Sequence, residues 1–153
     1  MLALLLAVSV CAAAPAGAIE TAGFGITPAG ADASRTSLHE RVRAGAAVRG
    51  AEADDAARAV IAGRGFGPYF THRTGHSIDA RALHGSGPHM DNYETREERA
   101  LLPGVGFSVE PGVYVPAGGG RPAVGARSEV NAFIGDGEGI ITPSEIQRDL
   151  IVV

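Results

Sequence analysis

Two stretches in the second half of the chain alternate between apolar and polar residues, a pattern typical of half-buried β-strands. In residues 107–115 the polar face carries Glu110, and in residues 124–134 it carries Glu129. The apolar positions of the first stretch are Phe107, Val109, Val113 and Val115. The pattern therefore predicts two strands, each with a glutamate on its polar face.

Helices are predicted in the first half of the chain. Over residues 51–62 apolar residues recur at helical spacing, and Gly63 is well placed to end that helix. An earlier helix is expected to begin at Ser37, because Ser37 and Glu40 stand in the S-x-x-E order of a capping box. We therefore expect two helices ahead of the β-rich part.

Residues 1–36 form an apolar, Gly- and Pro-rich N-terminal segment. Residues 2–10 are too few to span a bilayer, but they resemble the apolar core of a signal peptide, with small residues at 16–18 as a cleavage site. A remnant strand is the alternative interpretation. No Lys or Arg precedes the apolar run, so we expect a cytoplasmic protein, with export as the alternative. Residues 21–33 hold three glycines and a proline and predict a loop.

Composition limits the kind of site that the chain can build. A chain of 153 residues that is 45% hydrophobic fits one domain with a core of its own. The net charge of -4 and the lack of a basic cluster give no reason to expect a nucleic-acid partner, and no membrane partner is expected either. Cys11 is the only cysteine, which excludes an intramolecular disulfide and a thiolate metal cluster. A metal site would therefore consist of histidine and carboxylate side chains.

Three segments offer such side chains in order along the chain: HRTGHSID, FSVEPG and GARSEV. They contain His76, Glu110 and Glu129. A divalent ion that activates water needs several anionic or imidazole ligands from different strands and one open coordination position. Taken singly, each residue could equally be a polar group satisfied by its neighbours or a surface residue of a half-exposed sheet. Their sequence contexts make them a candidate set.

The three motifs in this order resemble the C-terminal half of the catalytic domain of the pita-bread metallopeptidases. That family includes methionine aminopeptidase, Xaa-Pro aminopeptidase and prolidase, and the chain is most similar to the Xaa-Pro branch. The resemblance covers roughly residues 38–153. It implies an α+β fold of the pita-bread (creatinase/aminopeptidase-like) type, mainly its C-terminal half, in which antiparallel strands carry the ligands. We therefore predict that residues 37–153 are a metallopeptidase catalytic-domain portion.

The resemblance also assigns metal ligands and a cofactor. By position in the family's motifs, His76, Glu110 and Glu129 would bind divalent metal, with Glu129 as the bridging carboxylate. Manganese is the expected metal, and zinc or cobalt are alternatives. Arg127 resembles the arginine that precedes the last ligand in the Xaa-Pro branch.

Two flanking histidines complete the implied site. His72 and His84 would hold the scissile carbonyl and the reaction intermediate, and Glu110 would take up a proton from the attacking water. His84 follows His76 by eight residues, one more than the usual spacing in the family. The resemblance thus implies His72, His84 and Glu110 as catalytic residues.

The sequence departs from the family upstream of these motifs. Two further ligands of the family are aspartates, and only Asp32, in the stretch DASRT, resembles the context of the second one. This predicts a truncated copy that binds about one metal ion at best. The implied function is metal-dependent hydrolysis of N-terminal peptide bonds, mainly of Xaa-Pro peptides. The alternative is a catalytically inactive pita-bread module for binding or assembly. An exposed sheet edge would favour a homodimer.

Overall fold

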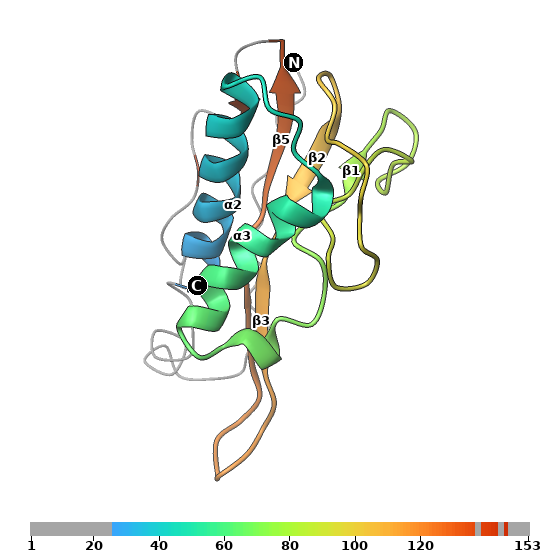
Figure 1. Ribbon diagram of the computed structural model, residues 1–153. Coiled ribbons are helices and arrows are strands. Elements are labelled where there is room, and N and C mark those ends of the chain that lie inside the picture. Colours follow the sequence, from blue (N-terminus) through green and yellow to red (C-terminus); the bar gives the residue numbers. More distant parts are fainter. Residues whose placement is uncertain (1–25, 137–138, 144–145, 147–153) are drawn as a thin grey trace.

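The computed structural model describes residues 26–136, 139–143 and 146 (Figure 1). Its helices are α2 (Ile26–Arg43) and α3 (Gly50–Gly63), followed by the short 3-10 helix η1 (Gly67–Tyr69). Its strands are β1 (Ser77–Ile78), β2 (Gly106–Val109), β3 (Gly112–Val115), β4 (Val124–Arg127), β5 (Val130–Gly135) and β6 (Gly139–Ile141). None of the helices in this part of the chain is long and apolar enough to cross a membrane.

The strands form two antiparallel sheets, and the helices cover the larger one. That sheet has the order β1-β2-β5-β6, whereas β3 and β4 make a separate hairpin. A shared core joins helices and sheet, with Leu38 from α2, Ala53 from α3, Phe107 from β2 and Ile134 from β5. Figure 1 shows α2 and α3 against each other on one side of the strands.

The helix α3 confirms the prediction for residues 51–62. Its buried face includes Ala53, Ala57 and Ile61, which stand at helical spacing. At its start, the Glu52 carboxylate accepts the backbone N–H of Arg49 at 2.8 Å. That contact satisfies one of the N–H groups that a helix N-terminus leaves without an intrahelical partner.

The helix α2 corrects the loop predicted for residues 21–33, as far as the structure describes them. It begins at Ile26 rather than at Ser37, so the predicted boundary after residue 36 falls inside it. Pro28 is tolerated because the first turn of a helix does not need its N–H. Gly30 allows a close approach to α3, since a Cβ there would lie 3.2 Å from the Ile61 Cδ1 atom. Tertiary packing thus holds a helix that its glycine and proline content disfavours; residues 1–25 lie outside the described residues.

The two predicted strands are each broken once, and the breaks lie side by side. The first divides into β2 and β3 at Glu110 and Pro111, and the second into β4 and β5 at Ser128 and Glu129. Val109 pairs with Val130 in one sheet and Gly112 pairs with Arg127 in the other. The registers therefore leave residues 110–111 opposite residues 128–129, where Ser128 N donates to Pro111 O at 3.2 Å. Both glutamates sit at this junction between the sheets.

Glu97 fastens the loop before β2 to the start of α3. Its carboxylate accepts Arg99 Nη2 at 2.6 Å and the backbone N–H groups of Arg99 and His89. The Arg99 guanidinium is the largest influence on the pKa of Glu97, which falls from 4.5 to about 2. Backbone bonds join Ala51 N to Glu97 O and Gly50 N to Arg99 O, so the loop is part of the folded core.

Glu97→Gln should therefore lower stability in a pH-dependent way. A depressed folded-state pKa stabilises the fold above pH 4.5, and that stabilisation is lost as the pH falls toward about 2. We expect the variant to be less stable than the wild type by about 2 kcal/mol at pH 7, after allowance for the exposed Arg99, and equally stable near the folded pKa. Urea unfolding at several pH values measures this. Glu98→Gln, at an exposed neighbour, is the control, and a parallel pH dependence of wild type and Glu97→Gln would contradict the assignment.

Candidate functional site

The side chains of Glu110 and Glu129 are joined by one arginine at the junction of the two sheets. Arg127 Nη1 lies 3.5 Å from Glu110 Oε2, and its Nη2 lies 2.9 Å from Glu129 Oε2. The arginine comes from the end of β4, two residues before Glu129. Because the strand is interrupted at Ser128 and Glu129, Arg127 at the end of β4 and Glu129 just before β5 both reach the junction.

His76 approaches Glu110 from the start of β1. Its Nε2 atom lies 3.3 Å from Glu110 Oε1, and only 5% of the residue is exposed. Its Nδ1 atom lies 3.0 Å from the carbonyl oxygen of Ser77, which can only accept, so Nδ1 carries a proton. In the neutral ring, Nε2 therefore turns a lone pair toward the Glu110 carboxylate. A proton or a cation between these two atoms would relieve that contact.

Ser108 orients both His76 and Glu110. Its hydroxyl donates to Glu110 Oε1 at 3.0 Å and accepts the backbone N–H of His76 at 3.0 Å. The backbone continues the pairing, because Ser108 N donates to His76 O and Glu110 N donates to Thr74 O. Sequence reasoning missed this role, although Ser108 shares the polar face of its predicted strand with Glu110.

His84 and His72 each contact a different residue around the junction. The His84 ring meets the His76 ring edge-on, with centroids 4.2 Å apart, despite the extra residue between them. His72 Nε2 lies 3.2 Å from the Tyr114 hydroxyl, and its Nδ1 lies 2.7 Å from the Arg73 carbonyl oxygen. The structure thus brings all five predicted site residues into one connected region.

Tyr114 links His72 to the charged centre. Burial raises the pKa of its hydroxyl, and the nearby guanidinium of Arg127 opposes part of that rise. Gly112 leaves the space for this contact, since a Cβ there would lie 2.5 Å from the Tyr114 hydroxyl and 2.8 Å from His72 Nε2. The sequence showed Tyr114 only as a polar-face residue of a predicted strand.

A buried ion pair on α3 supports the segment that carries the histidines. Asp54 is fully buried and accepts the backbone N–H groups of Thr74 at 2.8 Å and Asn92 at 3.0 Å. Its partner Arg58 donates to the carbonyl oxygens of Phe70 and His72. The sequence analysis did not identify these two residues, because a polar pair on a helix usually marks its solvated face.

The side chains of His76, Glu110 and Glu129 are of the types that bind a divalent ion, but they are not arranged as a metal site. One imidazole and two carboxylates match the ligands of manganese or zinc sites. Among the described residues, however, no three His, Cys, Asp or Glu side chains are grouped closely enough to hold a metal ion. The guanidinium of Arg127 instead balances the two carboxylates. Asp32, whose sequence context resembles that of an upstream ligand in the family, lies within α2 and forms an ion pair with Arg35 at 2.8 Å.

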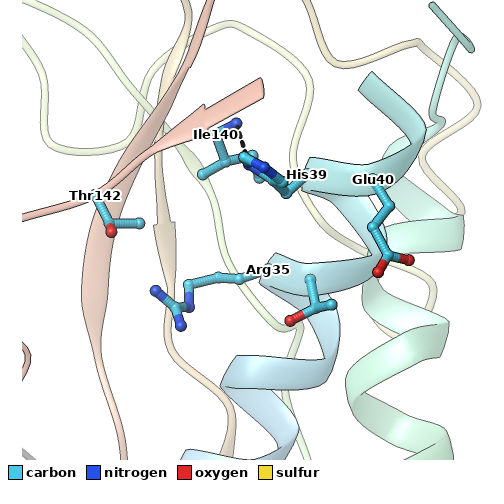
Figure 2. Close-up of a pocket in the computed structure, with 6 residues that line it drawn as sticks. Arg35, His39, Glu40, Ile140 and Thr142 are labelled. Carbon is cyan, nitrogen blue, oxygen red and sulfur yellow. Dashed lines mark hydrogen bonds between the residues drawn. The ribbon is translucent and has the colours of Figure 1, made fainter. Parts of the chain in front are cut away.

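Two surface hollows accompany these elements. One, of about 380 Å³, lies on the β3–β4 hairpin beside Tyr114 and is otherwise lined by Val115, Pro116, Ala123, Val124 and Gly125. The other, of about 190 Å³, lies between α2 and β6 (Figure 2). There the Arg35 side chain extends between the two elements, and His39 Nδ1 accepts the backbone N–H of Ile140 at 3.2 Å. None of the predicted site residues lines this second hollow.

Comparison with known proteins places the chain among peptidases. The model of metallopeptidase family M24 matches residues 31–136. The probable dipeptidase PepE of Mycobacterium tuberculosis is 37% identical over 121 residues, which are 78% of this chain and 28% of that protein. The chain thus spans less than a third of the length of this relative.

Solved structures agree on the fold. The Xaa-Pro dipeptidase from Bacillus anthracis matches with a TM-score of 0.71 and 27% identity, covering 92% of this chain and 34% of that one. Dipeptidase PepE from Mycobacterium ulcerans matches with a TM-score of 0.69 and 29% identity, covering 91% and 32%. These matches confirm the predicted α+β pita-bread fold. The chain belongs to metallopeptidase family M24.

Proposed function

We propose that residues 37–153 are the catalytic portion of a metal-dependent dipeptidase or aminopeptidase, and that His76, Glu110 and Glu129 are its metal ligands. The observation that carries this proposal is the junction of the two sheets, where His76 and Arg127 both contact Glu110 and Arg127 also contacts Glu129. A buried imidazole against one carboxylate, with a second carboxylate reached through a shared arginine, supplies the donor types that bind cations. Membership of a metallopeptidase family supports the same interpretation.

Manganese is the proposed metal, with zinc or cobalt as alternatives, because the donors are mostly carboxylate oxygen. When bound, such an ion would lower the pKa of a water molecule and polarise the peptide carbonyl. Glu110 is the proposed proton acceptor. The Ser108 hydroxyl already orients this carboxylate. Proton transfer to Glu110 therefore costs less conformational entropy of the Glu110 side chain.

His72 and His84 are the proposed contacts to the peptide carbonyl oxygen. His72 contacts Tyr114, and His84 packs against the His76 ring. An imidazole N–H can stabilise negative charge that develops on such an oxygen. His72 Nδ1 is engaged by the Arg73 carbonyl oxygen and Nε2 by the Tyr114 hydroxyl, so a substrate oxygen would replace that hydroxyl at Nε2, and the ring would donate to it only when both nitrogens carry a proton.

Peptides with proline in the second position are the proposed substrates. Xaa-Pro dipeptidases occur among the relatives and among the structural matches. The hollow beside Tyr114 is lined largely by Val115, Pro116, Ala123 and Val124, a surface that suits an apolar ring. A homodimer and a cytoplasmic location remain predictions.

One observation favours the second candidate, a pita-bread module without catalysis. The carboxylates are neutralised by Arg127, and no metal-ready group of three ligands occurs in the part of the chain that the structure describes. In that case the chain would bind peptides or partners without cleaving them.

Manganese titration separates the two candidates. We expect about one ion per chain, and slow or undetectable cleavage of Xaa-Pro dipeptides, because only one imidazole and two carboxylates supply the site. His76→Ala should abolish binding, since it removes that imidazole. His39→Ala removes a histidine that contacts β6 and should leave binding unchanged. Two tightly bound ions, or binding that survives His76→Ala, would contradict the proposed ligand set.

A further inference from the structure

Arg127 occupies the centre of the acidic junction, and its position has consequences for any cation that binds there. It forms ion pairs with both Glu110 and Glu129, at 3.5 and 2.9 Å. Its Nε atom is buried and has no hydrogen-bond partner within the described residues. An arginine held by a complete set of acceptors would use this donor as well. The guanidinium is held by a hydrogen bond from Nη2 to Glu129 Oε2 and by the charge of Glu110, while its Nε donor stays unused within the part of the chain that the structure describes.

We propose that Arg127 is an internal counter-ion that competes with a divalent cation for Glu110 and Glu129. This inference rests on the proposed function in one respect, namely that these carboxylates are metal ligands. A cation that enters between the carboxylates meets the positive guanidinium, and the two charges cannot share the same oxygen atoms without strong repulsion. Binding of the cation therefore requires Arg127 to move away.

The surroundings allow that movement. A third of the Arg127 side chain is exposed, at 33%, so part of it already faces solvent. The Tyr114 hydroxyl lies near the guanidinium and can accept a hydrogen bond from it. The two carboxylates are more buried, with 13% and 25% of their side chains exposed. The carboxylates thus stay at the junction while the arginine leaves.

Arg127 could instead support metal binding, and its removal would then change the metal affinity in the opposite direction. If the arginine instead orients the carboxylates for the metal, its removal should weaken metal binding, as loss of outer-shell partners generally does. Competition predicts tighter binding on removal. The sign of the change in affinity therefore decides between a competing and a supporting arginine.

The test is the dissociation constant of manganese, measured by calorimetry and by electron paramagnetic resonance of the free ion. Arg127→Gln should bind manganese roughly tenfold more tightly than the wild type, the equivalent of one charge-assisted hydrogen bond. Arg127→Lys keeps the positive charge but not the planar guanidinium that reaches both carboxylates, so its affinity should lie between those of the wild type and Arg127→Gln. Arg121→Gln makes the same change in net charge at an exposed residue near the tip of the β3–β4 hairpin and should leave the affinity unchanged. Circular dichroism verifies that each variant is folded.

Each outcome has a distinct meaning. Tighter binding by Arg127→Gln but not by Arg121→Gln supports competition. Equal or weaker binding by Arg127→Gln, with measurable binding by the wild type, overturns competition and leaves the metal ligands in place. Absence of binding in both proteins overturns the ligand assignment in the proposed function, and competition with it. An equal gain in Arg121→Gln would show a general charge effect and would also overturn the inference.

Discussion

Replacing Asp54 by alanine is expected to lower the free energy of unfolding by about 4 kcal/mol, the cost of breaking a buried ion pair from one side. Asp54 is fully buried and accepts hydrogen bonds from Arg58 and from the backbone of Thr74 and Asn92. Alanine would leave these donors without an acceptor, and unsatisfied buried donors are more costly than the bonds themselves are stabilising. Urea unfolding followed by circular dichroism measures the loss.

Asp55→Ala is the matched control for this prediction. Asp55 follows Asp54 on the same helix, is exposed, and accepts a hydrogen bond of 2.8 Å from the Asn92 side-chain amide. Its replacement should cost less than about 1 kcal/mol. If Asp54→Ala lowered the free energy of unfolding no more than Asp55→Ala, the Asp54–Arg58 pair would not stabilise the segment that carries the histidines.

The Asp54–Arg58 pair also shows where sequence reasoning failed. A charged residue on an amphipathic helix usually lies on the solvated face, but the Arg58 guanidinium lies over the Phe70 ring, 4.2 Å from its centroid, and 4.6 Å from that of Tyr93. Helical spacing indicates which apolar residues turn inward. It does not reveal a polar pair whose partners are backbone groups far along the chain.

The position of Glu110 at the junction has a cause that is visible in its own motif. Glu110 precedes Pro111, which cannot continue a ladder, and this break turns the glutamate toward the neighbouring sheet. The predicted alternation was correct within each short strand but could not show that each strand leaves one sheet for another. That break depends on pairing between residues 109 and 130, which only the folded chain reveals.

The first part of α2, before Ser37, was missed because its local sequence disfavours a helix that the tertiary contacts stabilise. Its residues from Ile26 to Ala33 have weak helical propensity, and Ser37 with Glu40 offered a plausible later start. The fold compensates through distant contacts, such as the 3.0 Å hydrogen bond between the Thr27 and Ser128 hydroxyls. Propensity predicts a helix well only where local preference and tertiary packing agree.

Gly75→Ala should reduce both stability and metal binding, because no space exists for a side chain at this position. An added Cβ would lie 1.9 Å from the Ser108 carbonyl oxygen and 2.8 Å from its carbon, which are backbone atoms that cannot turn aside. Gly75 is also fixed from the other side, where it exchanges two backbone hydrogen bonds with Met90. The clash can be relieved only by separating residues 74–76 from residues 108–110.

That separation would break the contacts that position the proposed ligands. The hydrogen bonds from Ser108 N to His76 O and from Glu110 N to Thr74 O belong to this pairing. We expect a loss of about 3 kcal/mol in the free energy of unfolding, as for severe overpacking, together with weaker manganese binding. Gly63→Ala is the control, since nothing lies within 4 Å of a Cβ at the end of α3, and it should be neutral or slightly stabilising. Urea unfolding and manganese titration of both variants measure the difference, and a stable Gly75→Ala protein with unchanged affinity would show that His76 and Glu110 do not depend on this pairing for their positions.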